Sequence, residues 1–253
     1  MPAAYEQYLV PVVFRPFAED LTARAAALRP GRVLELAAGT GVLTSSLLAA
    51  APWAEVTATD LNEAMVAFGS DRAPDAVWRQ ADAQRLPFPD GGFDLVVCQF
   101  GVMFFPDRIE AFTEVHRVLA PGGRFLFNTW GPLGTHSFEV ALQAGLERAF
   151  PADPPRFFAT VPHGYSDPSV VAADLAAAGF TVEDEQELTL QGQAASTADL
   201  AIGYLTGTPV RMAVEERGGG PAVKATVVEE MTARLGPGPV TAPMTAYVFR
   251  AAA

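Results

Sequence analysis

The feature that most constrains the fold is the stretch at residues 33–44, Val-Leu-Glu-Leu-Ala-Ala-Gly-Thr-Gly-Val-Leu-Thr. An apolar run ends at Leu36, a loop of small residues carries Gly39 and Gly41, and a helical pattern begins at Val42. Glycines in such a loop let backbone N–H groups approach an anionic or polar ligand at a helix N-terminus, because no Cβ stands in the way. The stretch therefore predicts a buried strand that turns into a helix and binds a ligand at the turn.

An acidic residue, Asp60, follows the glycine loop in the sequence. Asp60 ends a second apolar run at residues 55–59 and lies about 20 residues beyond the glycine loop, where open α/β folds place a carboxylate on ribose hydroxyls. The glycine loop and Asp60 together predict a site for a nucleoside-containing cofactor.

The register of the glycines indicates which cofactor is held. The dinucleotide motif G-x-G-x-x-G would need a small residue at position 44, where Thr44 stands. The loop instead matches acid-x-small-x-Gly-x-Gly, with Glu35 and Ala37 in the first two places. An NAD(P)-dependent oxidoreductase stays an alternative, because it would also explain the glycine loop and Asp60.

Three further segments follow in a fixed order: Asp82-Ala83 after a third apolar run, Leu-Pro-Phe-Pro-Asp-Gly-Gly-Phe-Asp at 86–94, and a helical pattern with a Pro-Gly-Gly turn at 114–125. With the glycine loop, these segments resemble the class I S-adenosylmethionine-dependent methyltransferases, in particular the small-molecule group that includes the ubiquinone and menaquinone methylases. The match is close over about residues 32–130.

This resemblance implies S-adenosylmethionine as the cofactor. In the family the glycine loop wraps the methionine half, the acid at 60 holds the ribose, and the Asp-Ala pair holds the adenine. The cofactor-binding residues expected here are Glu35, Ala37, Ala38, Gly39, Thr40, Gly41, Asp60, Leu61, Met65, Asp82, Ala83, Gln99 and Phe100. Ala37 departs from the glycine that is usual at that place in the family.

Several of these acids have a structural alternative. Glu35 would equally serve to stabilise the backbone of the glycine loop. Asp60 would otherwise cap the following helix, although Asn62 is also suited to that role. Asp90 is interpreted as a turn residue and Asp107 as a helix N-cap.

Strands and helices alternate along the chain. Strands are predicted at about 32–37, 54–59, 76–80, 93–98 and 122–130, with helices near 41–51, 62–70 and 107–119. Such alternation predicts an α/β, doubly wound fold. The resemblance implies a seven-stranded, mostly parallel Rossmann-like sheet with helices on both faces and a small helical and loop embellishment after strand five.

We expect residues 1–253 to form a single methyltransferase domain with four parts. Residues 1–30 form an N-terminal helical lid, and residues 31–130 form the cofactor-binding core. Residues 131–240 form an acceptor-side insertion that completes the sheet, and residues 241–253 carry the last strand. The aromatic residues Tyr5, Tyr8, Phe14 and Phe17 precede the sheet, either as a lid over the cofactor or as ordinary packing.

Composition limits the partners and the location. The chain is 50% hydrophobic and 18% charged, so it is not a disordered chain. No apolar run approaches the roughly 20 residues of a membrane helix, and no signal peptide is evident, so we expect a cytoplasmic protein without membrane insertion. A net charge of −12, with a single lysine at Lys224, argues against a nucleic acid partner. The sequence leaves the oligomeric state open.

The catalytic residues are less clearly marked. His136 lies just past the fifth strand, and His163 and Tyr165 lie in a proline-rich loop, so any of the three is a candidate proton acceptor. Because the histidines, including His116, are scattered along the chain, no metal site is expected. Cys98 follows Val97 rather than the proline of cytosine C5-methylases, so we interpret it as a buried, inert thiol.

The function that follows is transfer of a methyl group from S-adenosylmethionine to a small, apolar or aromatic molecule by in-line displacement. The NAD(P)-dependent alternative leaves the Asp82-Ala83 pair unexplained. A non-catalytic cofactor-binding protein on the same fold is the second alternative.

Overall fold

The computed structural model describes residues 2–253, and its contacts divide the chain into two compact units. Residues 17–130, 165–188 and 246–253 form one of them, which we call the sheet unit. Residues 2–16, 131–164 and 189–245 form the other, which we call the helical unit. The expectation of a single methyltransferase domain stays a prediction.

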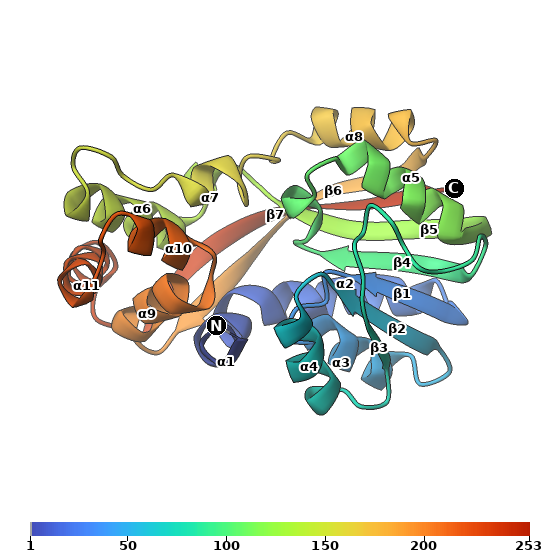
Figure 1. Ribbon diagram of the computed structural model, residues 1–253, viewed down its shortest axis with the longest axis horizontal. Helices are drawn as coiled ribbons and strands as arrows, with labels where there is room; N and C mark the ends of the chain where they lie inside the picture. The colour runs from blue at the N-terminus through green and yellow to red at the C-terminus, as the bar shows by residue number, and fades with distance from the viewer. Residues whose placement is uncertain (1) are drawn as a thin grey trace. The chain divides into compact units, whose positions relative to one another are not determined.

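The sheet has seven strands within the described residues, in the order β3-β2-β1-β4-β5-β7-β6 (Figure 1). They are β1 Arg32–Leu36, β2 Glu55–Asp60, β3 Val77–Gln80, β4 Phe93–Gln99, β5 Leu119–Trp130, β6 Thr181–Ala194 and β7 Val240–Ala252. Strands β1 to β5 pair in parallel, and β7 pairs antiparallel to β5. The order confirms the predicted mostly parallel, Rossmann-like sheet.

Strand β4 lies in the middle of this order and is apolar on both faces. Leu95, Val96, Val97 and Cys98 are all buried, as a central parallel strand requires. The same continuous apolar run made this strand predictable from the sequence.

The helices that accompany the sheet are α2 Arg15–Ala27, α3 Val42–Ala50, α4 Glu63–Arg72, α5 Arg108–Val118 and α8 Pro168–Ala177, with a short 3₁₀ helix η2 at Val102–Phe104. Two of them begin at the predicted caps. Asn62 accepts the Ala64 N–H at the start of α4, and Asp107 accepts the Glu110 N–H at the start of α5, each at 2.9 Å. Helices α5 and α8 pack side by side (Figure 1).

The helical unit consists mainly of short helices. They are α1 Pro2–Ala4, the π-helix η1 Tyr5–Phe14, the 3₁₀ helix η3 Leu133–Thr135, α6 Ser137–Ala149, α7 Phe157–Thr160, α9 Thr197–Gly207, α10 Val210–Glu216 and α11 Pro221–Leu235. Helix α6 packs closely on α11, where a Cβ added at Gly145 would lie 2.9 Å from the Cα of Val227. Gly145 therefore permits the close approach of these two helices.

Two predictions of local structure were wrong in detail. Strand β5 begins at Leu119 rather than at residue 122, and its pairing with β4 shifts between Phe93↔Leu119 and Leu95↔Arg124. The Pro-Gly-Gly turn therefore lies inside an irregular part of the strand, where Gly122 has a positive φ of 78°. The proline-rich loop also contains the four-residue helix α7.

The aromatic residues near the N-terminus belong to two different groups. Phe17 is fully buried in the sheet unit, edge-on to Phe100 and to Trp130 with ring centroids 5.2 Å apart in both pairs. Tyr5 packs on Phe14 in the helical unit at 4.8 Å. Phe17 is therefore a core residue.

No helix between residues 2 and 253 is both long and apolar enough to cross a bilayer.

Candidate active site

The predicted cofactor residues meet at one edge of the sheet unit. The glycine loop follows β1, Asp60 is the last residue of β2, the Asp82-Ala83 pair follows β3, and Gln99 is the last residue of β4. Because β1 to β4 are parallel neighbours, their carboxyl ends lie at the same edge (Figure 1). Segments that are separate in the sequence are therefore brought together where α/β folds bind their ligands.

Asp60 ties the glycine loop to strand β2. Its Oδ2 accepts the Gly39 N–H at 2.9 Å, and its Oδ1 accepts the Asn62 N–H at 2.8 Å. Burial raises the pKa of Asp60, and these two hydrogen bonds act in the opposite direction because they stabilise the charged form. Because Asn62 itself caps helix α4, the carboxylate of Asp60 links the glycine loop to the start of that helix.

Glu35 is buried beneath this loop, with 2% of its surface exposed. The Thr44 hydroxyl donates to Glu35 Oε2 at 2.6 Å and so joins β1 to the first turn of α3. Burial raises the pKa of Glu35 to about 8, against the weaker opposing effect of the Thr44 hydrogen bond, and the nearby charge of Asp60 raises it further. The partner of Glu35 is thus Thr44, the residue that breaks the dinucleotide motif.

Two residues of this edge have backbones in the left-handed region. Ala37 has a φ of 51° and Phe100 has a φ of 52°, values that residues other than glycine rarely adopt. The Phe100 N–H donates to Asn128 Oδ1 at 2.9 Å, and its ring stacks on Trp130 at 3.4 Å with an interplanar angle of 7°. Such strained residues gather at functional sites, where surrounding contacts hold them in place.

The adenine side of the predicted site is more open. Asp82 is exposed and accepts the Gln84 N–H at 2.9 Å. Leu61 is 66% exposed although it is a large apolar residue, and Met65 is half-buried. This combination offers an apolar surface and a carboxylate at one edge, which suits a flat aromatic ring that carries an amino group.

Arg117 on α5 anchors the loop between β3 and β4. Its guanidinium donates to the backbone oxygens of Leu86 and Phe88 and to the carboxylates of Glu114 and Asp90, at 2.7–3.0 Å. Asp90 is therefore part of the turn, as predicted, and is fixed there by an ion pair.

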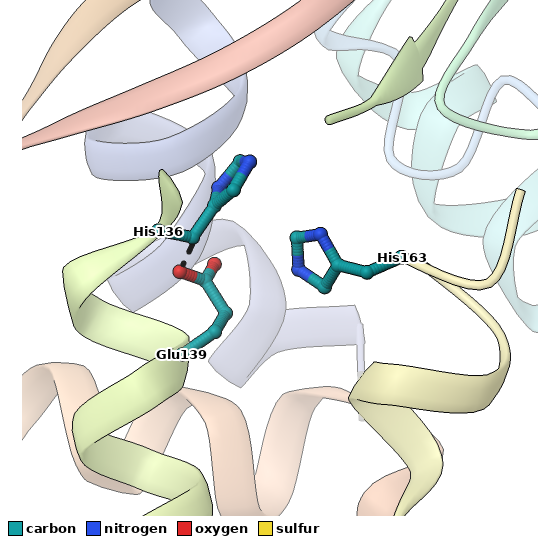
Figure 2. Close-up of side chains that lie close together, drawn as sticks. All are labelled: His136, Glu139 and His163. Carbon is teal, nitrogen blue, oxygen red and sulfur yellow. Dashed lines mark ion pairs between the residues drawn. The ribbon is translucent and has the colours of Figure 1, made fainter. Parts of the chain in front are cut away.

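The three catalytic candidates are divided between the units. In the helical unit, His136 and His163 lie with their ring centroids 4.4 Å apart, and Glu139 joins them from the first turn of α6 (Figure 2). All three side chains are buried. One ligand atom of each lies within 4.8 Å of the others, and His136 Nδ1 is 3.9 Å from Glu139 Oε2.

The histidine pair is neutral at physiological pH. Burial lowers the pKa of His136 to about 3, assisted by the neighbouring His163, and burial lowers the pKa of His163 to about 4. Burial also raises the pKa of Glu139 to about 7, partly offset by the hydrogen bond that its Oε1 accepts from the Tyr204 hydroxyl. Each imidazole thus presents one nitrogen lone pair at pH 7.

Tyr165 belongs to the sheet unit and has different partners. Its hydroxyl donates to Asp174 Oδ2 at 2.7 Å, and the Arg108 guanidinium lies 4.2 Å from the ring centroid. Burial and Asp174 raise the pKa of Tyr165 well above its ordinary value, so the phenol holds its proton firmly. His116, the remaining histidine, packs on Phe180 in the same unit.

Cys98 is fully buried, and burial raises the pKa of its thiol. The burial predicted for it is confirmed. A thiol that does not ionise is a poor nucleophile.

Four polar residues of these clusters escaped the sequence reasoning: Thr44, Asn128, Glu139 and Tyr204. One of them carried a usable signal. Glu139 lies three residues after His136 at the start of α6, and this spacing places two side chains on one helix face. The others act through pairings that no local pattern marks, because their partners are distant in the sequence.

Comparison with known proteins agrees with this arrangement. A family model described as a methyltransferase domain matches residues 34–127. A demethylmenaquinone methyltransferase from Thermus thermophilus is 35% identical over 169 residues, which cover 62% of this chain and 77% of that protein. A ubiquinone/menaquinone biosynthesis C-methyltransferase from Burkholderia mallei is 40% identical over 152 residues, covering 54% of this chain and 63% of that protein.

The Burkholderia match thus spans less than two thirds of that relative's length. Among solved structures, the YcgJ protein from Bacillus subtilis superposes with a TM-score of 0.57 at 20% identity, covering 94% of this chain and 98% of that one. At such low identity the likeness is one of fold.

Proposed function

This chain belongs to the class I S-adenosylmethionine-dependent methyltransferases, and we propose that it methylates a small apolar or aromatic molecule by in-line displacement. The enzyme class and the cofactor are properties of the family. An NAD(P)-dependent oxidoreductase and a non-catalytic binding protein, the two alternatives, do not agree with this membership.

We assign the cofactor to the carboxyl edge of the sheet unit. The glycine loop contacts the methionine half, Asp60 takes the ribose hydroxyls, and the Asp82 carboxylate takes the adenine amino group. The exposed face of Leu61 supports this assignment, because an apolar side chain beside Asp60 suits the adenine ring. The hydrogen bond between Gly39 and Asp60 supports it further, because it prepares the loop before the ligand arrives.

The observation that carries the acceptor proposal is the 35% identity to a demethylmenaquinone methyltransferase. The reduced, hydroquinone form of such a ring is aromatic, which agrees with the acceptor class proposed from the sequence. The net charge of −12 agrees with it as well, since an acidic protein repels phosphate backbones. We propose that residues 131–240 supply the specificity for this acceptor.

The chemistry asks the protein mainly for alignment. The methyl group of the sulfonium is already a strong electrophile, so the protein must hold nucleophile, methyl carbon and sulfur in line and exclude water. Alignment of this kind supplies about 7–11 kcal/mol. Of the three proposed proton acceptors, His136 and His163 are neutral but are weak bases because burial lowers their pKa, whereas Tyr165 would first have to lose a proton that it holds firmly.

An acceptor screen tests the proposal. The purified full chain is incubated with methyl-labelled S-adenosylmethionine and, separately, with reduced 1,4-naphthoquinones, substituted phenols, small aliphatic amines, a protein mixture and transfer RNA. We expect label in the first two classes and release of S-adenosylhomocysteine. Label confined to amines, protein or RNA would overturn the proposed acceptor and leave the enzyme class intact.

A further inference from the structure

We propose that His136, Glu139 and His163 form a binding site for a divalent transition metal ion such as Zn²⁺ or Fe²⁺. The three side chains lie close together in the helical unit, His136 and Glu139 at the start of α6 and His163 in the turn after α7 (Figure 2). No metal site was expected from the sequence, because His136 and His163 stand far apart along the chain. The fold brings them together.

The donor set suits such an ion. Two imidazoles and one carboxylate bind catalytic zinc and non-haem iron in proteins, and they leave at least one coordination position for water or another oxygen donor. Calcium and magnesium prefer sites built from oxygen alone. The two nitrogens therefore favour a first-row transition metal.

The protons of both imidazoles are positioned by backbone carbonyls. His136 Nε2 lies 2.8 Å from the oxygen of Thr245, and His163 Nδ1 lies 2.8 Å from the oxygen of Gly131. A carbonyl oxygen only accepts, so these two nitrogens carry the protons. The lone pairs consequently belong to His136 Nδ1 and His163 Nε2, and an N–H donated to a backbone carbonyl is the usual arrangement of metal-binding histidines.

The two carbonyls are themselves joined. The Gly131 N–H donates to the Thr245 oxygen at 2.8 Å, so one short path of backbone connects the outer sides of both rings. This path holds the rings at a defined separation within the unit.

Glu139 is held in the same manner. Tyr204, which is 3% exposed, donates its hydroxyl to Glu139 Oε1, while Oε2 is the oxygen nearest to His136 Nδ1. Glu139 is 4% exposed, and a buried carboxylate is unfavourable unless its charge is compensated. A cation at the centre of the cluster would supply that compensation and favour the ionised form.

The spacing allows an ion after a small adjustment. Ligands on a tetrahedral zinc stand about 3.4 Å from one another, given metal–ligand distances of about 2.0–2.1 Å. The three donor atoms lie within 4.8 Å of one another, so closure requires side-chain movements of about 1–1.5 Å, within the reach of χ rotations. His136 and His163 would then be metal ligands in place of the proton acceptors proposed above.

Metal binding is measured on the full chain after treatment with a chelator. Zn²⁺ is titrated by calorimetry, the bound metal is counted by mass spectrometry after gel filtration, and Co²⁺ is used to record the visible spectrum of the site. We expect one ion per chain and Co²⁺ bands typical of mixed nitrogen and oxygen ligands. Less than 0.2 ions per chain (on the order of adventitious binding) would overturn the proposal.

Variants localise the site. Glu139→Gln keeps the shape of the side chain and removes its charge, and we expect it and His163→Gln each to weaken zinc binding more than about 10-fold. Tyr204→Phe removes only the hydroxyl that positions Glu139, and we expect a smaller loss. His116→Gln, at the histidine of the sheet unit, is the matched control and is expected to bind as the unaltered chain does.

Folding of each variant is checked by circular dichroism and thermal unfolding. Should Glu139→Gln fold poorly, His163→Gln and the Co²⁺ spectrum decide the question. Zinc binding that survives both substitutions would contradict the proposal. A second outcome concerns an unaltered enzyme that takes up no metal and is active without one. Loss of methyl transfer in His163→Gln would then contradict the metal site and return the histidines to a proton-acceptor role.

Discussion

The backbone amide of Gly39 donates a 2.9 Å hydrogen bond to Asp60 Oδ2, which joins the loop after β1 to the last residue of β2. An ionised carboxylate has about four acceptor positions, and amide hydrogens occupy two of those on Asp60. The remaining positions are available to ribose hydroxyls. The glycine loop and Asp60, which were recognised separately in the sequence, are therefore joined in the structure.

Substitution of Arg117 should loosen the loop that follows the adenine segment. Arg117→Lys keeps the charge but cannot reproduce the planar fork that reaches Leu86, Phe88 and Asp90 together. We expect a loss of about 1–3 kcal/mol in the free energy of unfolding and faster hydrogen exchange at residues 86–90. Thermal unfolding and exchange measured by mass spectrometry test this, with Arg85→Lys at an exposed site as the control. Equal behaviour of the two variants would contradict it.

A methyl group at position 101 should collide with the one at position 37. A Cβ on Gly101 would lie 2.6 Å from the Ala37 Cβ and 2.6 Å from Cys98 Sγ. We expect Gly101→Ala to destabilise the chain by about 1–3 kcal/mol. The double variant Ala37→Gly/Gly101→Ala should recover about 1 kcal/mol of this, because glycine removes one of the two contacts and also tolerates the φ of 51°.

Chemical denaturation measures both values. Gly134→Ala is the control, since an added Cβ there meets no atom within 4 Å. A double variant no more stable than Gly101→Ala would show that the Ala37 methyl group is not the obstacle.

Glu35 should make stability depend on pH. Its pKa is raised from 4.5 to about 8 in the folded chain, so the unfolded state releases this proton first as the pH rises. The contribution of Glu35 to the free energy of unfolding is therefore complete below pH 4.5 and is lost progressively up to about pH 8. The effect amounts to up to a few kcal/mol. Glu35→Gln cannot ionise, so its stability should fall less steeply across this window.

The comparison is made on slopes, because the substitution also changes the absolute stability. Glu55→Gln, at an exposed residue of β2, should keep the slope of the unaltered chain. Parallel curves for the Glu35→Gln variant and the unaltered chain between pH 5 and 8 would contradict a buried, protonated Glu35.

The sequence predicted the carboxyl ends of strands β1 to β4 well for a physical reason. Parallel strands that alternate with helices all end at the same edge, so locating the ends of β1 to β4 also locates their side chains relative to one another. The apolar run of β4 and the caps Asn62 and Asp107 were local patterns, and the structure confirms them.

The histidine cluster could not be predicted in this way. His136 and His163 meet because of the path of an irregular, proline-rich segment, and no periodic pattern records that path. Their hydrogen-bonding neighbours, Thr245 and Tyr204, come from distant elements.

The cytoplasmic location, the absence of a nucleic acid partner and the N-terminal lid stay predictions.

The central claim is that S-adenosylmethionine binds at the carboxyl edge of the sheet unit through Asp60, and calorimetry with S-adenosylhomocysteine tests it most directly. We predict one site per chain in the unaltered protein, with binding weakened about 10- to 100-fold in Asp60→Asn, since a hydrogen bond to a charged group contributes about 1.5–3 kcal/mol. Asp71→Asn, which removes an exposed acid on α4, should bind as the unaltered chain does. The absence of binding heat in the unaltered protein, or equal affinity in Asp60→Asn, would contradict the account.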